Sequence, residues 1–194
     1  MPILSVFSGT KGRTVFKALK MTAGFKTLYF GGKMIRRLQS KDMDAACDIV
    51  NDNWKSAYVN EELLGEKGCA DRKERLKKDF LSGRLENYID EQDHQVVALL
   101  SIGPSEDPDK AGSFEVWRIY LKKEFQRQKI GSDFIHFAEA QARKEGFHEI
   151  VIWAFQKNTS ALAFYQKNGY RVDQTNYLGK PFFAYALRLQ KTLL

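Results

Sequence analysis

A polar run that leads directly into a helix is the part of this sequence best suited to bind a ligand. Residues 126–129 read Gln-Arg-Gln-Lys, and Ile130-Gly131-Ser132 follow at the start of an apolar helical pattern. The first backbone N–H groups of a helix have no partner inside it, and the helix dipole adds positive potential there. Arg127 and Lys129 add charge, and a glycine allows close approach of the backbone. The run predicts an anion site suited to phosphates, although an ordinary strand-to-helix junction could have the same composition.

The elements that must position this run alternate along the chain between short apolar stretches and helical ones. We expect seven strands, at residues 34–38, 87–92, 95–103, 113–121, 149–155, 170–177 and 181–189. Apolar spacing of three to four residues predicts four helices, at residues 40–58, 70–84, 130–145 and 158–168. Their order predicts one α/β (α+β) domain with a mixed sheet flanked by helices.

Composition excludes several classes of protein. The 194 residues carry a formal charge of +7, but six basic and no acidic groups lie within residues 1–33. Residues 34–194 therefore hold 25 basic and 24 acidic groups, and a broad nucleic-acid surface is not indicated. No apolar run approaches the length that spans a membrane.

Cysteine and histidine spacing gives no sign of a disulfide framework or a metal site. Cys47 and Cys69 have neither paired nor metal-ligand spacing, which favours a reducing, cytoplasmic location. The three histidines, His94, His136 and His148, lie in different predicted elements, and we expect no metal.

Residues 1–33 differ in kind from the rest, since they are free of acidic groups and lack a clean helix or strand period. We expect either a disordered extension or a translated leader that precedes the natural start at Met34. The residues Gly31-Gly32-Lys33 can be encoded by a purine-rich stretch like a bacterial ribosome-binding site. A targeting segment is the alternative, but there is no secretory apolar core and only one arginine. The chain is therefore divided into an extension, 1–33, and a domain, 34–194.

Two motifs, in this order, resemble those of the GNAT superfamily of acyl-CoA-dependent N-acetyltransferases. The superfamily's phosphate loop reads [Gln/Arg]-x-x-Gly-x-[Gly/Ala]; Gln126 and Gly131 match it, and Lys129 replaces the first glycine. Residues 158–170, NTSALAFYQKNGY, match Asn-x-x-Ala-x-x-Phe-Tyr-x-x-x-Gly-[Phe/Tyr]. The resemblance covers residues 34 to about 189 and is strongest over 113–170.

The resemblance implies a sheet whose central strands splay, with the pantetheine arm of acetyl-CoA entering between them like an added strand. It assigns to this cosubstrate the backbone of Ile119, Tyr120 and Leu121, the segment Gln126, Arg127, Gln128, Lys129, Ile130, Gly131 and Ser132, and, on the next helix, Asn158, Ala161 and Tyr165.

Lys129 departs from the family motif. A left-handed backbone at a residue with a side chain would cost roughly 1–2 kcal/mol. A charge-assisted contact to phosphate would offset about that much. We therefore expect Lys129 to keep a negative φ at the helix entrance while the phosphate site is retained.

Two residues carry the chemistry that the resemblance implies. Tyr165 matches the family tyrosine near the cofactor sulfur and can protonate the leaving thiolate; a core aromatic is the alternative reading. Glu115 lies eleven positions before Gln126, where some members place a glutamate base. Burial on a central strand would raise its pKa toward a useful range. Glu115 could instead pair with Arg118 or a lysine, with ordered water as the route for the proton.

The acceptor side is expected to come from the first two helices and the last hairpin. Trp54, Tyr58 and Tyr177 either line an acceptor pocket or cover the sheet. The resemblance implies acetyl transfer to a primary amine of a small molecule or a protein N-terminus. The alternatives are a catalytically degenerate CoA-binding regulatory module and a tRNA-directed acetyltransferase, and a homodimer is compatible with the sequence.

Overall fold

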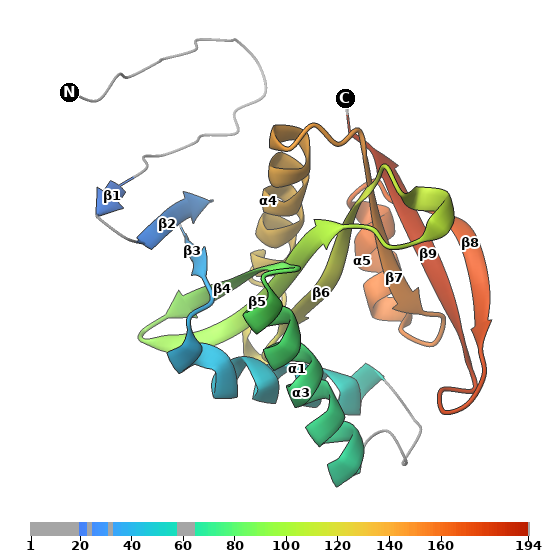
Figure 1. Ribbon diagram of the computed structural model, residues 1–194, viewed down its shortest axis with the longest axis horizontal. Helices are drawn as coiled ribbons and strands as arrows, with labels where there is room; N and C mark the ends of the chain where they lie inside the picture. The colour runs from blue at the N-terminus through green and yellow to red at the C-terminus, as the bar shows by residue number, and fades with distance from the viewer. Residues whose placement is uncertain (1–19, 23–24, 31–32, 58–64, 194) are drawn as a thin grey trace.

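The computed structural model describes residues 20–22, 25–30, 33–57 and 65–193, and nine strands of these residues form one sheet (Figure 1). The strands lie in the order β1-β2-β3-β4-β5-β6-β7-β9-β8. Their bounds are β1 Lys20–Thr22, β2 Phe25–Phe30, β3 Lys33–Arg37, β4 Glu86–Gln92, β5 Gln95–Pro104, β6 Phe114–Leu121, β7 Glu149–Phe155, β8 Arg171–Leu178 and β9 Ala184–Thr192. The seven predicted strands are confirmed as β3 to β9, and β1 and β2 extend the sheet from within residues 1–33.

Four α-helices in the described residues cover both faces of the sheet, as predicted. They are α1 Met43–Ala57, α3 Glu66–Ser82, α4 Ile130–Lys144 and α5 Thr159–Lys167. Three short 3-10 turns accompany them: η1 Ser40–Asp42, η2 Pro108–Lys110 and η3 Lys123–Phe125. Figure 1 shows α1 and α3 on one side of the sheet and α4 and α5 on the other. None of the described helices combines the length and the apolar character needed to cross a membrane.

Alternation along the strands produces two apolar cores, one on each face of the sheet. The larger core joins β6 and β7 to α4 and α5, and it includes Phe114, Val116 and Ile152. The smaller core lies under α1 and α3, where Tyr120 packs beside Trp54. Strand β6 therefore presents opposite faces to the two helix layers, so that residues on it reach both sides of the sheet.

The two central strands separate after a short paired stretch. Strands β6 and β7 are parallel and pair only at Phe114 with Ile150 and at Glu115 with Val151. Beyond Glu115, β6 stays paired to β5 through Leu121, and β7 stays paired to β9 through Phe155. A register shift in the β5–β6 ladder, between Ser101 and Ile102, marks a bulge close to the point of separation. The inner edges of β6 and β7 thus diverge, which confirms the predicted splay (Figure 1).

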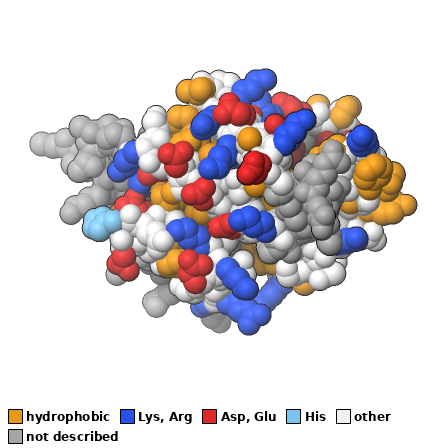
Figure 2. Space-filling view, turned by 90° about the horizontal axis from the view of Figure 1, so that it is seen from below, with side chains coloured by type: hydrophobic (Ala, Val, Ile, Leu, Met, Phe, Trp, Pro, Cys, Tyr) orange, Lys and Arg blue, Asp and Glu red, His pale blue; other side chains and the backbone are white. Residues whose placement is uncertain are grey.

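Charged side chains of both signs cover the face that Figure 2 shows. Lys and Arg are interspersed there with Asp and Glu, rather than gathered in a field of one sign. Large apolar side chains gather instead at the end of the molecule where β8 and β9 meet. Tyr177, Phe183 and Tyr185 are 57%, 61% and 51% exposed.

Candidate active site

The turn between β6 and α4 takes an unusual backbone path. Arg127 has φ 61° and Lys129 has φ 66°, both in the left-handed region, and α4 begins at the next residue, Ile130. The expectation of a negative φ at Lys129 is therefore wrong. The turn keeps the conformation that a glycine supplies in the family motif, although a lysine has to adopt it at a cost of roughly 1–2 kcal/mol.

Backbone N–H groups at this turn precede the hydrogen-bond ladder of α4. The first bond of that ladder is donated by Asp133 N to Lys129 O at 2.9 Å. The N–H groups of Ile130, Gly131 and Ser132 come before it and point out of the helix start. Left-handed residues beside a helix start make a concave array of N–H donors, which is a backbone anion site. The geometry suits the phosphate site predicted from the sequence.

Packing favours a glycine at position 131, in addition to the close approach of the backbone that glycine allows. A Cβ added at this position would lie 3.2 Å from Cζ of Phe164 on α5. The absence of a side chain lets the start of α4 lie directly against α5. The two helices that would flank a bound diphosphate and thioester are thereby held together.

The edge of β6 that faces the gap follows from the β5–β6 ladder. Lys122 N donates to Val97 O at 2.9 Å, and antiparallel strands alternate between residues that face their partner and residues that face away. The backbone groups of Tyr120 therefore face β5, whereas those of Ile119 and Leu121 face the gap. Of these, the carbonyl of Leu121 accepts a hydrogen bond from Asn53 Nδ2 at 2.9 Å.

Tyr165 lies on α5 beneath the sheet and is 6% exposed. Burial, with Tyr120 adding to it, raises the pKa of its phenol well above the ordinary value. Ala161, on the same helix, packs against the same core. Asn158 caps α5, because its side-chain oxygen accepts from Ala161 N at 3.2 Å. The predicted cap and the shared helix are confirmed, and a neutral phenol is available at neutral pH.

Glu115 lies where β6 and β7 part, and it is 5% exposed. Desolvation by burial is the largest influence on this carboxyl and raises its pKa to about 7. The Ser105 hydroxyl donates to Glu115 Oε2 at 2.9 Å and works in the opposite direction. Arg118, the partner that the sequence offered, instead pairs with Asp79 of α3. A carboxyl with this pKa can accept a proton near neutrality.

An aromatic cluster lies on the α1 side of the gap. The ring centroids of Trp54 and Phe155 are 5.8 Å apart, and Phe182 lies 6.4 Å from Trp54 and 6.1 Å from Phe155. Trp54 Nε1 also donates to the hydroxyl of Tyr120 at 3.2 Å. The prediction did not include Phe155 and Phe182, although Phe155 ends the predicted strand 149–155 and Phe182 lies at the start of the last predicted strand, 181–189.

The other two predicted acceptor residues do not join this cluster. Tyr177 is exposed on β8 and contacts Tyr185 at 5.1 Å between ring centroids. Tyr58 lies outside the described residues. Among the described residues, no three or more His, Cys, Asp or Glu side chains are grouped so that they could hold a metal ion.

Comparison with known proteins shows which family has this fold and these motifs. The model of the acetyltransferase (GNAT) family matches residues 46–170. A spermidine N(1)-acetyltransferase of Thermoplasma acidophilum is 27% identical over 150 residues, covering 73% of this chain and 90% of the relative.

Solved structures share the fold. A ribosomal-protein-alanine N-acetyltransferase from Brucella melitensis matches with a TM-score of 0.65 at 22% identity, over 82% of this chain and 99% of its own. The PaiA N-acetyltransferase of Thermoplasma acidophilum, crystallised with coenzyme A, matches with a TM-score of 0.62 at 21% identity, over 79% and 96%. Because the family model spans well over half of the chain, the protein belongs to the acetyltransferase (GNAT) family and is an N-acetyltransferase.

Proposed function

We propose that acetyl-CoA is bound along the gap between β6 and β7 and that Glu115 and Tyr165 move the protons of the transfer. The observation that carries the proposal is the end of β6–β7 pairing at Glu115 and Val151. This separation leaves the inner edge of β6 without a strand partner beside a helix start rich in N–H donors. A cosubstrate with an amide-bearing arm and a diphosphate matches both features.

The chemical groups of the residues present are suited to bind that cosubstrate. Backbone N–H groups from Arg127 to Ser132 and the charge of Lys129 would hold the diphosphate, and Ile119 and Leu121 would pair with the arm. Acetyl-CoA supplies the activated acetyl group when bound. The Leu121 carbonyl already accepts from Asn53, so we expect Asn53 to turn aside or to share this acceptor.

Glu115 would take the proton that an ammonium group must lose before its nitrogen can attack. The new C–N bond would form at the thioester carbon as the C–S bond breaks. Tyr165 would give its proton to the leaving sulfur, and its phenolate would regain one from the acylated nitrogen, which must lose a second proton to become the amide. A base with a pKa of about 7 is half ionised at neutral pH, which suits this task. No covalent intermediate with the protein is needed, since both reactants are held together.

The acceptor would be a primary amine that approaches on the α1 side, past Trp54, Phe155 and Phe182. Aromatic rings attract a cationic head group and pack on an alkyl chain. A small-molecule polyamine agrees with the relative that is a spermidine N(1)-acetyltransferase, and a protein N-terminus agrees with the ribosomal-protein-alanine N-acetyltransferase. A cytoplasmic location is part of the proposal, since Cys47 and Cys69 have neither paired nor metal-ligand spacing in the sequence.

A panel of amines assayed for release of coenzyme A thiol tests the proposal. We expect turnover with polyamines or with peptides that have a free N-terminus, and loss of turnover in Glu115→Gln. Binding of acetyl-CoA without turnover of any amine would instead favour the regulatory module. The division of the chain at Met34 stays a prediction, and N-terminal sequencing of the native protein tests it.

A further inference from the structure

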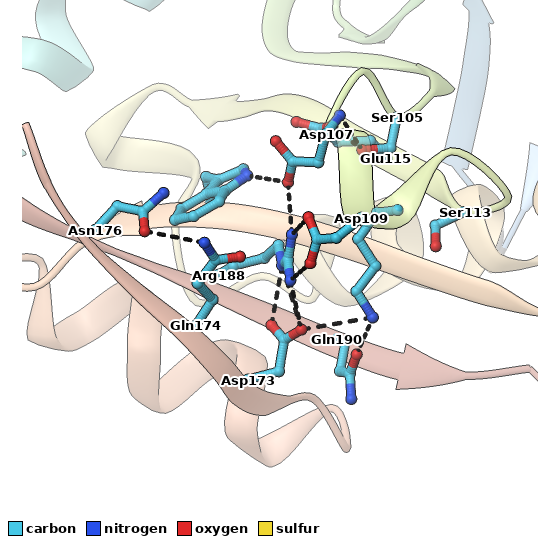
Figure 3. A network of polar contacts seen from close by, with 12 residues as sticks. Ser105, Asp107, Asp109, Ser113, Glu115, Asp173, Gln174, Asn176, Arg188 and Gln190 are labelled. Atoms are coloured by element: carbon cyan, nitrogen blue, oxygen red, sulfur yellow. Dashed lines mark hydrogen bonds and ion pairs between the residues drawn. The ribbon is translucent and has the colours of Figure 1, made fainter.

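A buried arginine lies at the centre of a carboxylate network behind Glu115 (Figure 3). Arg188, on β9, is 3% exposed. Its guanidinium donates to Asp109 at 2.8 and 2.6 Å, to Asp173 Oδ2 at 2.9 Å and to Asp107 Oδ2 at 3.0 Å. Buried ion pairs are weak evidence for stability, because desolvation offsets much of the attraction. The network is therefore better explained by the geometry that it fixes than by a gain in stability.

The network connects Arg188 to Glu115 through a short series of hydrogen bonds. Arg188 Nη1 and, at 2.9 Å, Trp153 Nε1 both donate to Asp107 Oδ2. The backbone N of Asp107 donates to Ser105 Oγ at 3.3 Å. Ser105 Oγ in turn donates to Glu115 Oε2 at 2.9 Å. In Figure 3, Asp107 lies between the arginine and the Ser105–Glu115 pair.

The loop that carries Ser105 and Asp107 is fixed at its other end too. It runs from β5 to β6 and closes on itself, because Ser105 N donates to Ser113 O at 2.9 Å. Lys110 Nζ donates to Glu149 Oε1 at 2.9 Å. Strands β7 and β9 therefore hold this loop through separate contacts.

We propose that Arg188 is a positioning residue for the transfer reaction: by fixing Asp107, it holds the turn that presents the Ser105 hydroxyl to the Glu115 carboxylate. The inference rests on the proposed role of Glu115 as base. Nothing in the motifs of the family points to Arg188, which lies 73 positions after Glu115 in the sequence.

The charged and polar groups that face Glu115 determine in which direction its pKa would change. Asp107 and Glu106 of the loop raise its pKa, whereas the Ser105 hydroxyl and Arg84 lower it. The neighbouring strands pair their Gly103 and Val151 with it, and neither has a titratable side chain. Loss of the hydroxyl contact therefore raises the pKa of Glu115, and less of the base is ionised at neutral pH.

The test compares Arg188→Lys and Ser105→Ala with the wild type. Lysine keeps the charge of Arg188 but cannot reach three carboxylates with a planar fork. The matched control is Arg36→Lys on β3, another buried arginine that pairs with two carboxylates, Asp42 and Glu91. The Glu115 carboxyl is titrated by carbon-13 NMR in each protein, and kcat/KM for the best amine is measured from pH 5 to 9. Thermal melting checks that each variant is folded.

We expect the pKa of Glu115 to rise by about one unit in Arg188→Lys and in Ser105→Ala, and to stay constant in Arg36→Lys. Activity should then fall about fivefold at pH 7 and return to the wild-type level at pH 9. An unchanged titration in folded Arg188→Lys would overturn the positioning role, and so would a loss of activity that is equal at every pH.

The titration also separates this inference from the proposed function. If the NMR titration shifts but the pH profile of kcat/KM does not follow it, Arg188 positions Glu115 and Glu115 is not the base. A shift in Ser105→Ala without one in Arg188→Lys would assign the effect to the hydroxyl and refute the part given to Arg188.

Discussion

The left-handed backbone at Lys129 reverses the usual order of stability of two variants, so that glycine should be more stable than alanine at this position. The variants Lys129→Gly and Lys129→Ala both remove the charge, but only glycine relieves a φ of 66°. The left-handed region costs a residue with a side chain roughly 1–2 kcal/mol. The greater freedom of glycine in the unfolded chain returns about 0.4–1 kcal/mol of that difference. We therefore expect Lys129→Gly to be more stable than Lys129→Ala by about 1 kcal/mol.

The assay is urea unfolding, with the same pair of substitutions at Lys78 as the control. Lys78 is an exposed residue inside α3, where alanine should be the more stable by about 1 kcal/mol. The order of the two variants should thus reverse between the two lysines. Greater stability of alanine at both sites would refute the left-handed assignment.

Affinity for coenzyme A, measured by calorimetry, tests the role of the charge at the same position. If Lys129 contacts phosphate as proposed, each variant would lack one charge-assisted contact and should bind about tenfold more weakly than the wild type. Equal affinities for the wild type and both variants would mean that the backbone N–H groups alone bind the diphosphate and that the lysine side chain is merely tolerated.

Three further substitutions test the rest of the site. Glu115→Gln should lower kcat by about 10² or more. It should also raise the free energy of unfolding by about 3 kcal/mol at pH 8, with the gain vanishing below pH 4.5, because between 4.5 and about 7 the native carboxyl keeps a proton that the unfolded chain has lost. Urea unfolding at both pH values measures this, and a gain that does not depend on pH would contradict the buried carboxyl. Tyr165→Phe should lower kcat about 10²-fold without changing the affinity for acetyl-CoA, and a loss confined to affinity would argue against an acid. Gly131→Ala places Cβ 3.2 Å from Phe164 and should cost about 1 kcal/mol or more in thermal unfolding, whereas Gly112→Ala, which meets nothing within 4 Å, should not.

Most of the fold could be predicted because local patterns and tertiary structure agree. The predicted strand at 149–155 coincides with β7, and the predicted helix at 130–145 differs from α4 by one residue. The start of α3 at Glu66 was missed by four residues, since Gly65 and Gly68 hide a helix start among residues of low helix propensity. The strands β1 and β2 were not predicted either, because residues 1–33 show no alternation to indicate them.

Residues of the candidate site could be proposed from the sequence only where a motif encodes them. Glu115 and Tyr165 lie at fixed offsets from recognisable residues, and burial then sets the pKa of each. The φ of Lys129 was predicted wrongly, since an energetic argument at one residue ignored the demands of the whole turn. The contacts of Arg188 with Asp107 and Asp109 join residues about 80 positions apart. Only the meeting of β9 with the β5–β6 loop in the folded sheet creates them, and no local pattern records it.

The sheet order has a consequence for how the molecule assembles. Among the described strands, β8 lies at the edge and pairs with β9 alone, while β9 also pairs with β7. During folding, β8 can join the sheet only once β9 has paired with β7. The two strands should therefore add to the sheet together, as a hairpin. Arg188, which donates to Asp107 and Asp109 of the β5–β6 loop, lies on that same hairpin, so this network of contacts would form late in folding. Pulsed hydrogen exchange during refolding should find amides of β8 protected no earlier than those of β9.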